Sequence, residues 1–338
     1  MIHAWTEPVW RALVARGEPP PQPLLLAGPK GVGKSEFAHA VAQWLLCQEP
    51  TASGGCAACQ ACRLIESGNH PDYRVLQPGG DDGDADATEG AEARAGKRVA
   101  RSRWIKVEQV RDLNDFIHLA PHYGQRKAVL ILEAERLHPS AANALLKTLE
   151  EPPPGRHFLL VTHRPQSVLA TVRSRCLRLP FQLPPRQSAL AWLAEQGARD
   201  ASEALAWAGG APLHALAAEV PEHAKVRKWL VDRFLDAPEA DPVELSREID
   251  GETLPIIVAS LQRWCHDLML VRLAGDPRYY PGCAQILHRI AGLADLSALL
   301  GFLRELQSAV RLLEHPLNPR LVAESCLIGY RNLFAASR

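Results

Sequence analysis

The stretch that decides the fold is residues 24–46. It reads Leu-Leu-Leu-Ala at 24–27 and Gly-Pro-Lys-Gly-Val-Gly-Lys-Ser at 28–35, and then returns to helical spacing of apolar residues as far as Leu46. A buried strand, a glycine-rich turn and a helix in this order are typical of a loop that binds nucleotide phosphates. We therefore expect an α/β domain built on a parallel sheet.

The residue types in this loop indicate how phosphates would be held. Glycines let successive backbone amides turn inward at the start of a helix, where the amides and the helix dipole favour anions. Lys34 would reach the β- and γ-phosphates, and Ser35 would ligate Mg²⁺. The expected cofactor is ATP or ADP with Mg²⁺, and the alternative is a loop that keeps its shape but stays empty. The expected cofactor-binding residues of the loop are Gly28, Gly31, Gly33, Lys34 and Ser35.

Strand and helix patterns alternate after the loop. The spacing of apolar residues predicts a helix over 105–120, a buried strand over 127–132, a helix over 139–149 and a buried strand over 158–162. Alternation of this kind predicts a doubly wound α/β domain, which we expect to end near residue 182 at a group of prolines. Beyond that point the pattern is helical only, with a small group of helices up to about residue 219 and then a separate bundle.

The overall composition excludes several classes of protein. Lys plus Arg and Asp plus Glu both number 38, so the net charge is zero and a free-standing nucleic-acid binder is not expected. The first residues lack the basic and then apolar layout of a secretory signal, and no apolar run reaches membrane-spanning length. We expect a cytoplasmic protein with no membrane contact.

Four of the eight cysteines lie close together in the sequence, in the pattern Cys47-x8-Cys56-x2-Cys59-x2-Cys62. Gaps of two residues allow a tight turn to aim two sulfurs at one ion, and four thiolates suit a closed, structural Zn²⁺ site. The expected metal ligands are these four cysteines, which would fasten a small module over 47–62. The alternative is a redox dithiol formed by the last two of them.

Residues 77–103 form a separate segment with almost nothing apolar. Aspartates gather between 81 and 86, and basic residues follow from 94 to 103. Opposite charge blocks without apolar residues predict a mobile, solvated insertion. The alternative is an arm that binds DNA or a partner.

Two further motifs identify a family resemblance. Residues 143–152 read Asn-Ala-Leu-Leu-Lys-Thr-Leu-Glu-Glu-Pro, and Ser174-Arg175-Cys176 follows a short helix expected over 167–173. With the phosphate loop before them, these motifs resemble the clamp-loader branch of the AAA+ ATPases, and the four cysteines narrow the resemblance to bacterial three-domain subunits. The resemblance implies a RecA-like AAA+ domain over 1–182 that carries the zinc module, a helical lid over 183–220 and a helical collar for oligomerisation over 221–338.

The resemblance also assigns roles to single residues. It implies that Arg175 enters the ATP site of a neighbouring subunit as an arginine finger, because phosphoryl transfer builds charge that a guanidinium stabilises. Thr162 matches the polar residue that senses the γ-phosphate of ATP in this family. Leu132 stands where ATP-hydrolysing relatives have the aspartate that organises the metal, and Glu133 stands where they have the catalytic glutamate. Leu213 replaces the arginine of the lid, so weak or absent ATPase activity is expected unless Glu133 or Glu135 substitutes for the missing aspartate.

The partners implied by the resemblance are those of a pentameric clamp loader. They are three gamma/tau-type motor subunits, one delta-type wrench subunit that opens the sliding clamp, and primer-template DNA reached through the complex. This chain would be the fixed subunit that completes a neighbour's site. One alternative is a gamma/tau-type motor subunit, favoured by the intact Gly33-Lys34-Ser35 and opposed by Leu132 and Leu213. Another is a zinc-containing nucleotide kinase, which the motifs at 143–152 and 174–176 oppose.

Overall fold

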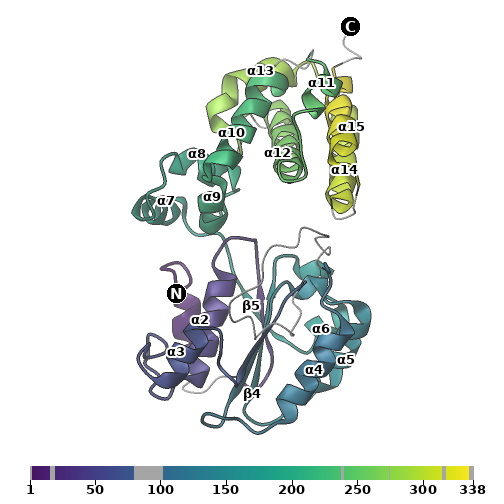
Figure 1. Cartoon of the computed structure of the whole chain (residues 1–338). Coiled ribbons are helices and arrows are strands. Elements are labelled where there is room, and N and C mark those ends of the chain that lie inside the picture. The colour runs from purple at the N-terminus through teal and green to yellow at the C-terminus, as the bar shows by residue number, and fades with distance from the viewer. Residues whose placement is uncertain are drawn as a thin grey trace, which may run out of the picture. The chain divides into compact units, whose positions relative to one another are not determined.

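The chain divides into two compact units, Met1–Leu183 and Pro184–Arg338, which are described separately. The structure is a computed structural model and describes residues 2–15, 20–79, 102–236, 240–273, 275–313 and 317–334. Most of the insertion expected over 77–103 lies outside the described residues. Figure 1 shows the course of the chain and labels its elements.

A five-stranded parallel sheet forms the centre of the first unit. Its strands are β1 (Leu24–Ala27), β2 (Tyr73–Leu76), β3 (Lys127–Ile131), β4 (Arg156–Thr162) and β5 (Leu177–Pro180), in the order β2-β3-β4-β1-β5. All neighbouring strands pair in parallel. The prediction of a parallel α/β sheet is thus confirmed. The short strands β2 and β5 were not predicted, because each has only four residues and they alternate with polar side chains.

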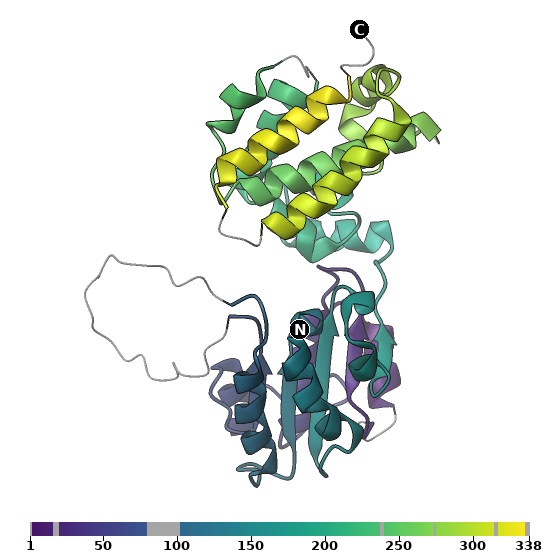
Figure 2. The ribbon, with the colours of Figure 1, turned by 90° about the vertical axis from the view of Figure 1, so that its right-hand side faces the viewer.

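Helices cover both faces of the sheet. One face carries α1 (Glu7–Val14), α2 (Lys34–Leu46) and α3 (Gln60–Glu66), and the other carries α4 (Val107–His118), α5 (Pro139–Glu150) and α6 (Ala170–Arg173) (Figures 1 and 2). Short 3₁₀ turns lie at Ala134–Arg136 and Pro165–Ser167. The helix expected over 167–173 is therefore shorter than predicted, since its first part is a 3₁₀ turn and an extended link.

The strand register brings separate sequence motifs to one edge of the sheet. Ala27, the last residue of β1, pairs with Thr162, the last residue of β4. Ile131, the last residue of β3, pairs with Leu160. Because the strands are parallel, the segments that follow β1, β3 and β4 leave the sheet at the same edge, which is where ligands bind in open α/β sheets.

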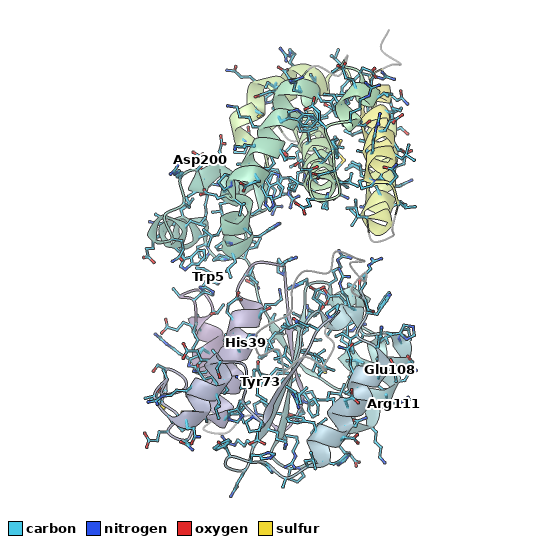
Figure 3. The ribbon with its side chains drawn as sticks, in the orientation of Figure 1. Trp5, His39, Tyr73, Glu108, Arg111 and Asp200 are labelled. Carbon is cyan, nitrogen blue, oxygen red and sulfur yellow. The ribbon has the colours of Figure 1, made fainter. Side chains whose placement is uncertain are left out.

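Two polar contacts connect the sheet to its surroundings on the β2 side. The Tyr73 hydroxyl lies 2.7 Å from Nδ1 of His39 on α2, and Figure 3 shows these two side chains between the helix and the sheet. At the same end of β2, the fully buried carboxylate of Asp72, the residue before Tyr73, lies 3.3 Å from the Lys127 ammonium and accepts backbone N–H groups of His122 and Tyr123. This buried network ties the loop before β3 to the sheet.

The second unit is helical in its described residues, as predicted for the sequence beyond about residue 182. Its helices are α7 (Arg186–Glu195), α8 (Ala201–Trp207), α9 (Pro212–Ala218), α10 (Pro221–Leu230), α11 (Pro242–Ser246), α12 (Leu254–Leu273), α13 (Ala284–Ala291), α14 (Leu296–Leu312) and α15 (Pro319–Asn332). A π-helical turn at Val231–Leu235 and a 3₁₀ turn at Pro281–Cys283 complete the set. No helix among the described residues is both long enough and apolar enough to cross a membrane.

The core of the second unit surrounds α12. Trp264 is fully buried, and its indole N–H donates to the Tyr330 hydroxyl at 2.9 Å, which in turn donates to the Leu235 carbonyl at 3.1 Å. The guanidinium groups of Arg227 and Arg263 both lie over the Trp207 ring of α8, at 4.7 and 4.0 Å from the ring centre. These contacts join α8, α10, α12 and α15 into one packed body.

Candidate functional site

The phosphate loop occupies the connection between β1 and α2, as its sequence predicts. Gly31 and Gly33 have φ angles of 79° and 87°, a conformation that residues with a side chain rarely adopt. Gly33 is the N-cap of α2, so Lys34 and Ser35 begin the helix. The loop therefore has the backbone that a phosphate cradle requires, with amide groups at a helix N-terminus.

Lys34 is turned into its own loop. Its ammonium group donates to the Gly28 carbonyl at 2.8 Å and also to the Pro29 carbonyl, and only 2% of the residue is exposed. Burial lowers the pKa of Lys34 to about 8, although Glu135 and Glu36 act in the opposite direction. The side chain is thus mainly protonated at neutral pH and satisfied by the loop itself.

An N-terminal segment packs on the loop, which the sequence did not predict. The Trp5 indole N–H donates to the Val32 carbonyl at 3.0 Å, and the His3 ring stacks on Trp5 with 4.6 Å between centres. Figure 3 labels Trp5 at this position. A Cβ atom at Gly33 would lie 2.5 Å from the His3 ring, so residue 33 must be glycine for its neighbour as well as for its φ angle.

A cavity of about 340 Å³ lies at the edge of the sheet beside the loop. Its lining includes Ser35 and the residues that follow β3 and β4; the full lining is Ser35, Gln77, Pro78, Ser102, Arg103, Leu132, Glu133, Arg136 and His163. The fold thus brings Ser35, Leu132 and Glu133 to the lining of one cavity. His163, Arg103 and Arg136 were not predicted as part of the site, because they lie in three separate segments of the sequence that only the tertiary fold brings to one cavity.

The carboxylates near the cavity differ in what they contact. Glu133 has a φ angle of 51° and pairs with Arg136 at 2.5 Å. Glu135 accepts the His163 backbone N–H at 3.1 Å through one oxygen, and its other oxygen is buried without a hydrogen-bond partner among the described residues. Leu132, which follows the last residue of β3, supplies no metal ligand. Glu135 is therefore the carboxylate whose buried oxygen remains available beside Lys34.

Thr162 is completely buried at the end of β4. Its hydroxyl accepts the Arg164 backbone N–H at 3.1 Å, and its carbonyl accepts the Gly28 N–H at 3.4 Å. Thr162 therefore lies directly beside the phosphate loop. Leu213, by contrast, belongs to the second unit, in the first turn of α9.

The residues present fit the phosphates of a nucleotide better than they fit its metal. Two glycines with positive φ, a protonated lysine and the Ser35 hydroxyl suit phosphate oxygens. The buried oxygen of Glu135 and the buried Nδ1 of His163 both lack partners among the described residues, so the site has polar groups to offer. Leu132 leaves the position of the metal-organising aspartate without a ligand.

Arg175 lies after α6 and is held by residues of its own chain. Its Nε and Nη2 atoms donate to one carboxylate oxygen of Glu150 at 3.0 and 2.7 Å, and its Nη1 atom donates to the Thr171 carbonyl at 3.1 Å. Glu150 is the last residue of α5, within the 143–152 motif. The fold thus joins the two motifs that carried the family resemblance.

The four clustered cysteines also come together in space. Their sulfur atoms all lie within 4.8 Å of one another, and the sulfurs of Cys47 and Cys59 are 3.9 Å apart. A tetrahedral zinc site with bonds of about 2.3 Å places its sulfurs roughly 3.8 Å apart, so the cluster fits a metal ion of this size. Cys47 caps the C-terminal end of α2, the helix that begins at the phosphate loop.

Backbone amides donate hydrogen bonds to three of the four clustered sulfurs. The N–H groups of Cys56, Cys59 and Cys62 donate to the sulfurs of Cys47, Cys56 and Cys59 at 3.2, 3.3 and 3.4 Å. Burial acts to raise the pKa of Cys59, but the backbone amides of Gln48 and Cys62 and the thiols of Cys56 and Cys62 together lower it to about 6. Burial raises the pKa of Cys47, and burial together with the neighbouring thiols raises the pKa of Cys62 to about 12, so binding a metal ion to these two sulfurs requires the loss of their protons.

Comparison with known proteins agrees with this geometry. The family model described as DNA polymerase III, delta subunit, matches residues 12–185. DNA polymerase III subunit delta′ of Escherichia coli is 32% identical over 75% of this chain and 72% of its own length. The chain belongs to the DNA polymerase III delta-prime family. The delta-prime subunit of Pseudomonas aeruginosa is 40% identical over 63% of this chain, and the match spans 60% of that relative's length.

A solved structure aligns with nearly the whole chain at low sequence identity. A DNA polymerase III gamma subunit-related protein from Thermotoga maritima aligns over 99% of this chain and 100% of its own, with 17% identity and a TM-score of 0.42. Membership of the delta-prime family rests on the family model and on the sequence relatives.

Proposed function

We propose that this chain is the delta-prime stator of the replicative DNA polymerase III clamp loader. In this role it assembles in the cytoplasm with gamma/tau motor subunits and a delta wrench subunit, and the complex loads the sliding clamp on primer-template DNA. The proposal rests on a contrast within one domain. Arg175 is present at the position of the donated arginine finger, while Leu132 replaces the aspartate that the chain would need to hydrolyse ATP itself. Such a chain is suited to completing another subunit's site.

The chemistry assigned to Arg175 is stabilisation of charge across an interface. A guanidinium presents N–H groups in a planar fork that matches phosphate oxygens, and an arginine supplied from outside makes hydrolysis conditional on assembly. The side chain of Arg175 is 29% exposed, so it is accessible to a neighbour without being a free surface residue. An arginine of this kind contributes about 10³–10⁵ to the rate of phosphoryl transfer in other NTPases.

The chain's own phosphate loop would bind nucleotide weakly and hydrolyse it slowly or not at all. The loop amides, Lys34 and Ser35 would hold the phosphates, and Thr162 would lie beside the γ-phosphate. Bound Mg²⁺ supplies charge neutralisation of the phosphates, but a leucine at 132 cannot organise it. Lys34 must also leave the Gly28 and Pro29 carbonyls before it contacts a phosphate, which lowers the affinity.

The cysteine cluster would hold a structural Zn²⁺ ion. Four thiolates leave no open coordination position, so the ion would fasten the 47–62 segment to the end of α2 rather than act in catalysis. A segment of this size has no core of its own, and metal binding then supplies most of its stability.

A gamma/tau-type motor subunit remains the second candidate, because the Gly33-Lys34-Ser35 sequence is intact and Glu135 has a buried oxygen beside Lys34. A motor requires a metal-organising carboxylate, and Glu135 would have to provide it. Measurement of ATP turnover by the purified chain alone separates the two candidates, since only a motor would show Mg²⁺-dependent turnover.

The test of the finger uses Arg175→Ala in the assembled loader, with clamp and primed DNA. We expect stimulated ATPase activity to fall at least tenfold while complex assembly is retained, because the side chain is partly exposed and contributes little to the core. Arg178→Ala is the matched control, since Arg178 is an exposed arginine three residues away. Unchanged ATPase activity in Arg175→Ala would remove the finger role.

A further inference from the structure

The guanidinium of Arg175 uses three of its five N–H groups in hydrogen bonds within its own chain. Two of its N–H groups go to Glu150 and one goes to the Thr171 carbonyl. Because arginine has five N–H donors, one N–H remains on each terminal nitrogen, with no further hydrogen bond among the described residues. Two parallel N–H groups are what a bidentate contact with phosphate oxygens uses.

The ion pair between Glu150 and Arg175 contributes little to the stability of the fold. Its side chain is 58% exposed, and exposed ion pairs contribute little to folding. It also lies in the last turn of α5, where the helix dipole disfavours a negative charge, and Glu151 follows it. A carboxylate at this place is therefore explained better by what it does to Arg175 than by packing or helix stability.

We propose that Glu150 is a positioning residue that holds Arg175 ready for a neighbouring subunit's nucleotide. This inference rests on the proposed role of Arg175 as a donated finger. Glu150 fixes the Nε and Nη2 side of the guanidinium, the Thr171 carbonyl fixes Nη1, and the two remaining N–H groups are left for the phosphate oxygens of an ATP bound by the neighbour. An arginine held in one orientation loses less conformational freedom when it makes these contacts.

The test compares variants in the loader assembled with its motor subunits, clamp and primed DNA. Glu150→Ala should lower the stimulated kcat about tenfold and leave the KM for ATP unchanged, because a free arginine side chain explores roughly thirty times more conformations than a held one and Thr171 keeps part of the restraint. Glu150→Gln should lose less, since its amide oxygen still accepts from Nε and Nη2. Glu151→Ala removes an adjacent carboxylate and should leave kcat unchanged.

Two further measurements keep the outcomes distinct. The double variant Glu150→Ala with Arg175→Ala should be no slower than Arg175→Ala alone, because Glu150 acts only through Arg175. A Glu150→Ala complex that is as fast as wild type or faster, while Arg175→Ala is slow, overturns the positioning role and leaves the finger intact. An equal loss in Glu151→Ala also overturns it. If Arg175→Ala itself is without effect, the finger and the positioning role both fail.

Discussion

Replacement of Asp72 by asparagine tests the buried network that holds the loop before β3. The carboxylate of Asp72 is fully buried and accepts the backbone N–H groups of His122 and Tyr123. It also lies 3.3 Å from the Lys127 ammonium, whose side chain is 1% exposed, and 3.6 Å from Nδ1 of the His122 ring. Asparagine has the same shape but places an NH₂ group among these donors and leaves Lys127 without a counter-charge. Removing one partner of a buried ion pair costs about 3–5 kcal/mol.

This energy converts into a large thermal shift. The first unit spans 183 residues, and for domains of about 150–250 residues each kcal/mol changes Tm by about 2–4 °C. A loss of about 4 kcal/mol therefore lowers the Tm of the first unit by about 8–16 °C. Scanning calorimetry of the full chain measures it, with Asp112→Asn on the exposed side of α4 as the control. A shift under about 3 °C would refute the reasoning, because the pair would then contribute no more than a surface pair.

The pH dependence gives an independent check on the same residue. Burial acts to raise the pKa of Asp72, but the Tyr123 and His122 amides and Lys127 together hold it below its usual value. A carboxyl group whose pKa is lowered by folding adds stability above its unfolded pKa of about 3.9, and this stability is lost as the pH falls through the lower, folded pKa. Asp72→Asn should therefore lose less stability on acidification than the wild type does.

Two further predictions concern the metal cluster and the phosphate loop. Native mass spectrometry should find one zinc ion per chain. Cys59→Ser should abolish zinc binding, whereas the control Cys176→Ser should retain it, because the Cys176 sulfur lies outside the cluster. A metal-free wild type whose 47–62 segment stays protected from proteolysis would contradict the zinc role. Gly33→Ala should destabilise the first unit by at least about 1 kcal/mol, because alanine must adopt a φ of 87° and its methyl group meets the His3 ring. Adding His3→Ala should recover only the part of this loss that comes from the clash with the ring. Full recovery of stability in the double variant would show that the φ angle costs nothing.

Local patterns were sufficient for the elements that carry strong periodicity or a strict motif. The apolar runs at 24–27 and 127–132 became β1 and β3, and the glycine spacing gave a loop with positive φ at Gly31 and Gly33. The cysteine spacing likewise anticipated four sulfurs within reach of one ion. Strands β2 and β5 were missed because they are short and half-polar, so their strand character comes from pairing with β3 and β1 rather than from their own residues.

By itself the sequence determined the order of the parallel α/β elements, the phosphate-loop backbone and the set of thiolate ligands, because each depends on residues close together along the chain. Only the tertiary structure decided which side chains meet. Trp5 contacts the phosphate loop 27 residues away, His163 enters the cavity through the register of β4, and Glu150 binds Arg175 across 25 residues. Contacts of this kind depend on how helices and strands pack in three dimensions, and residue spacing within one segment carries no information about that packing.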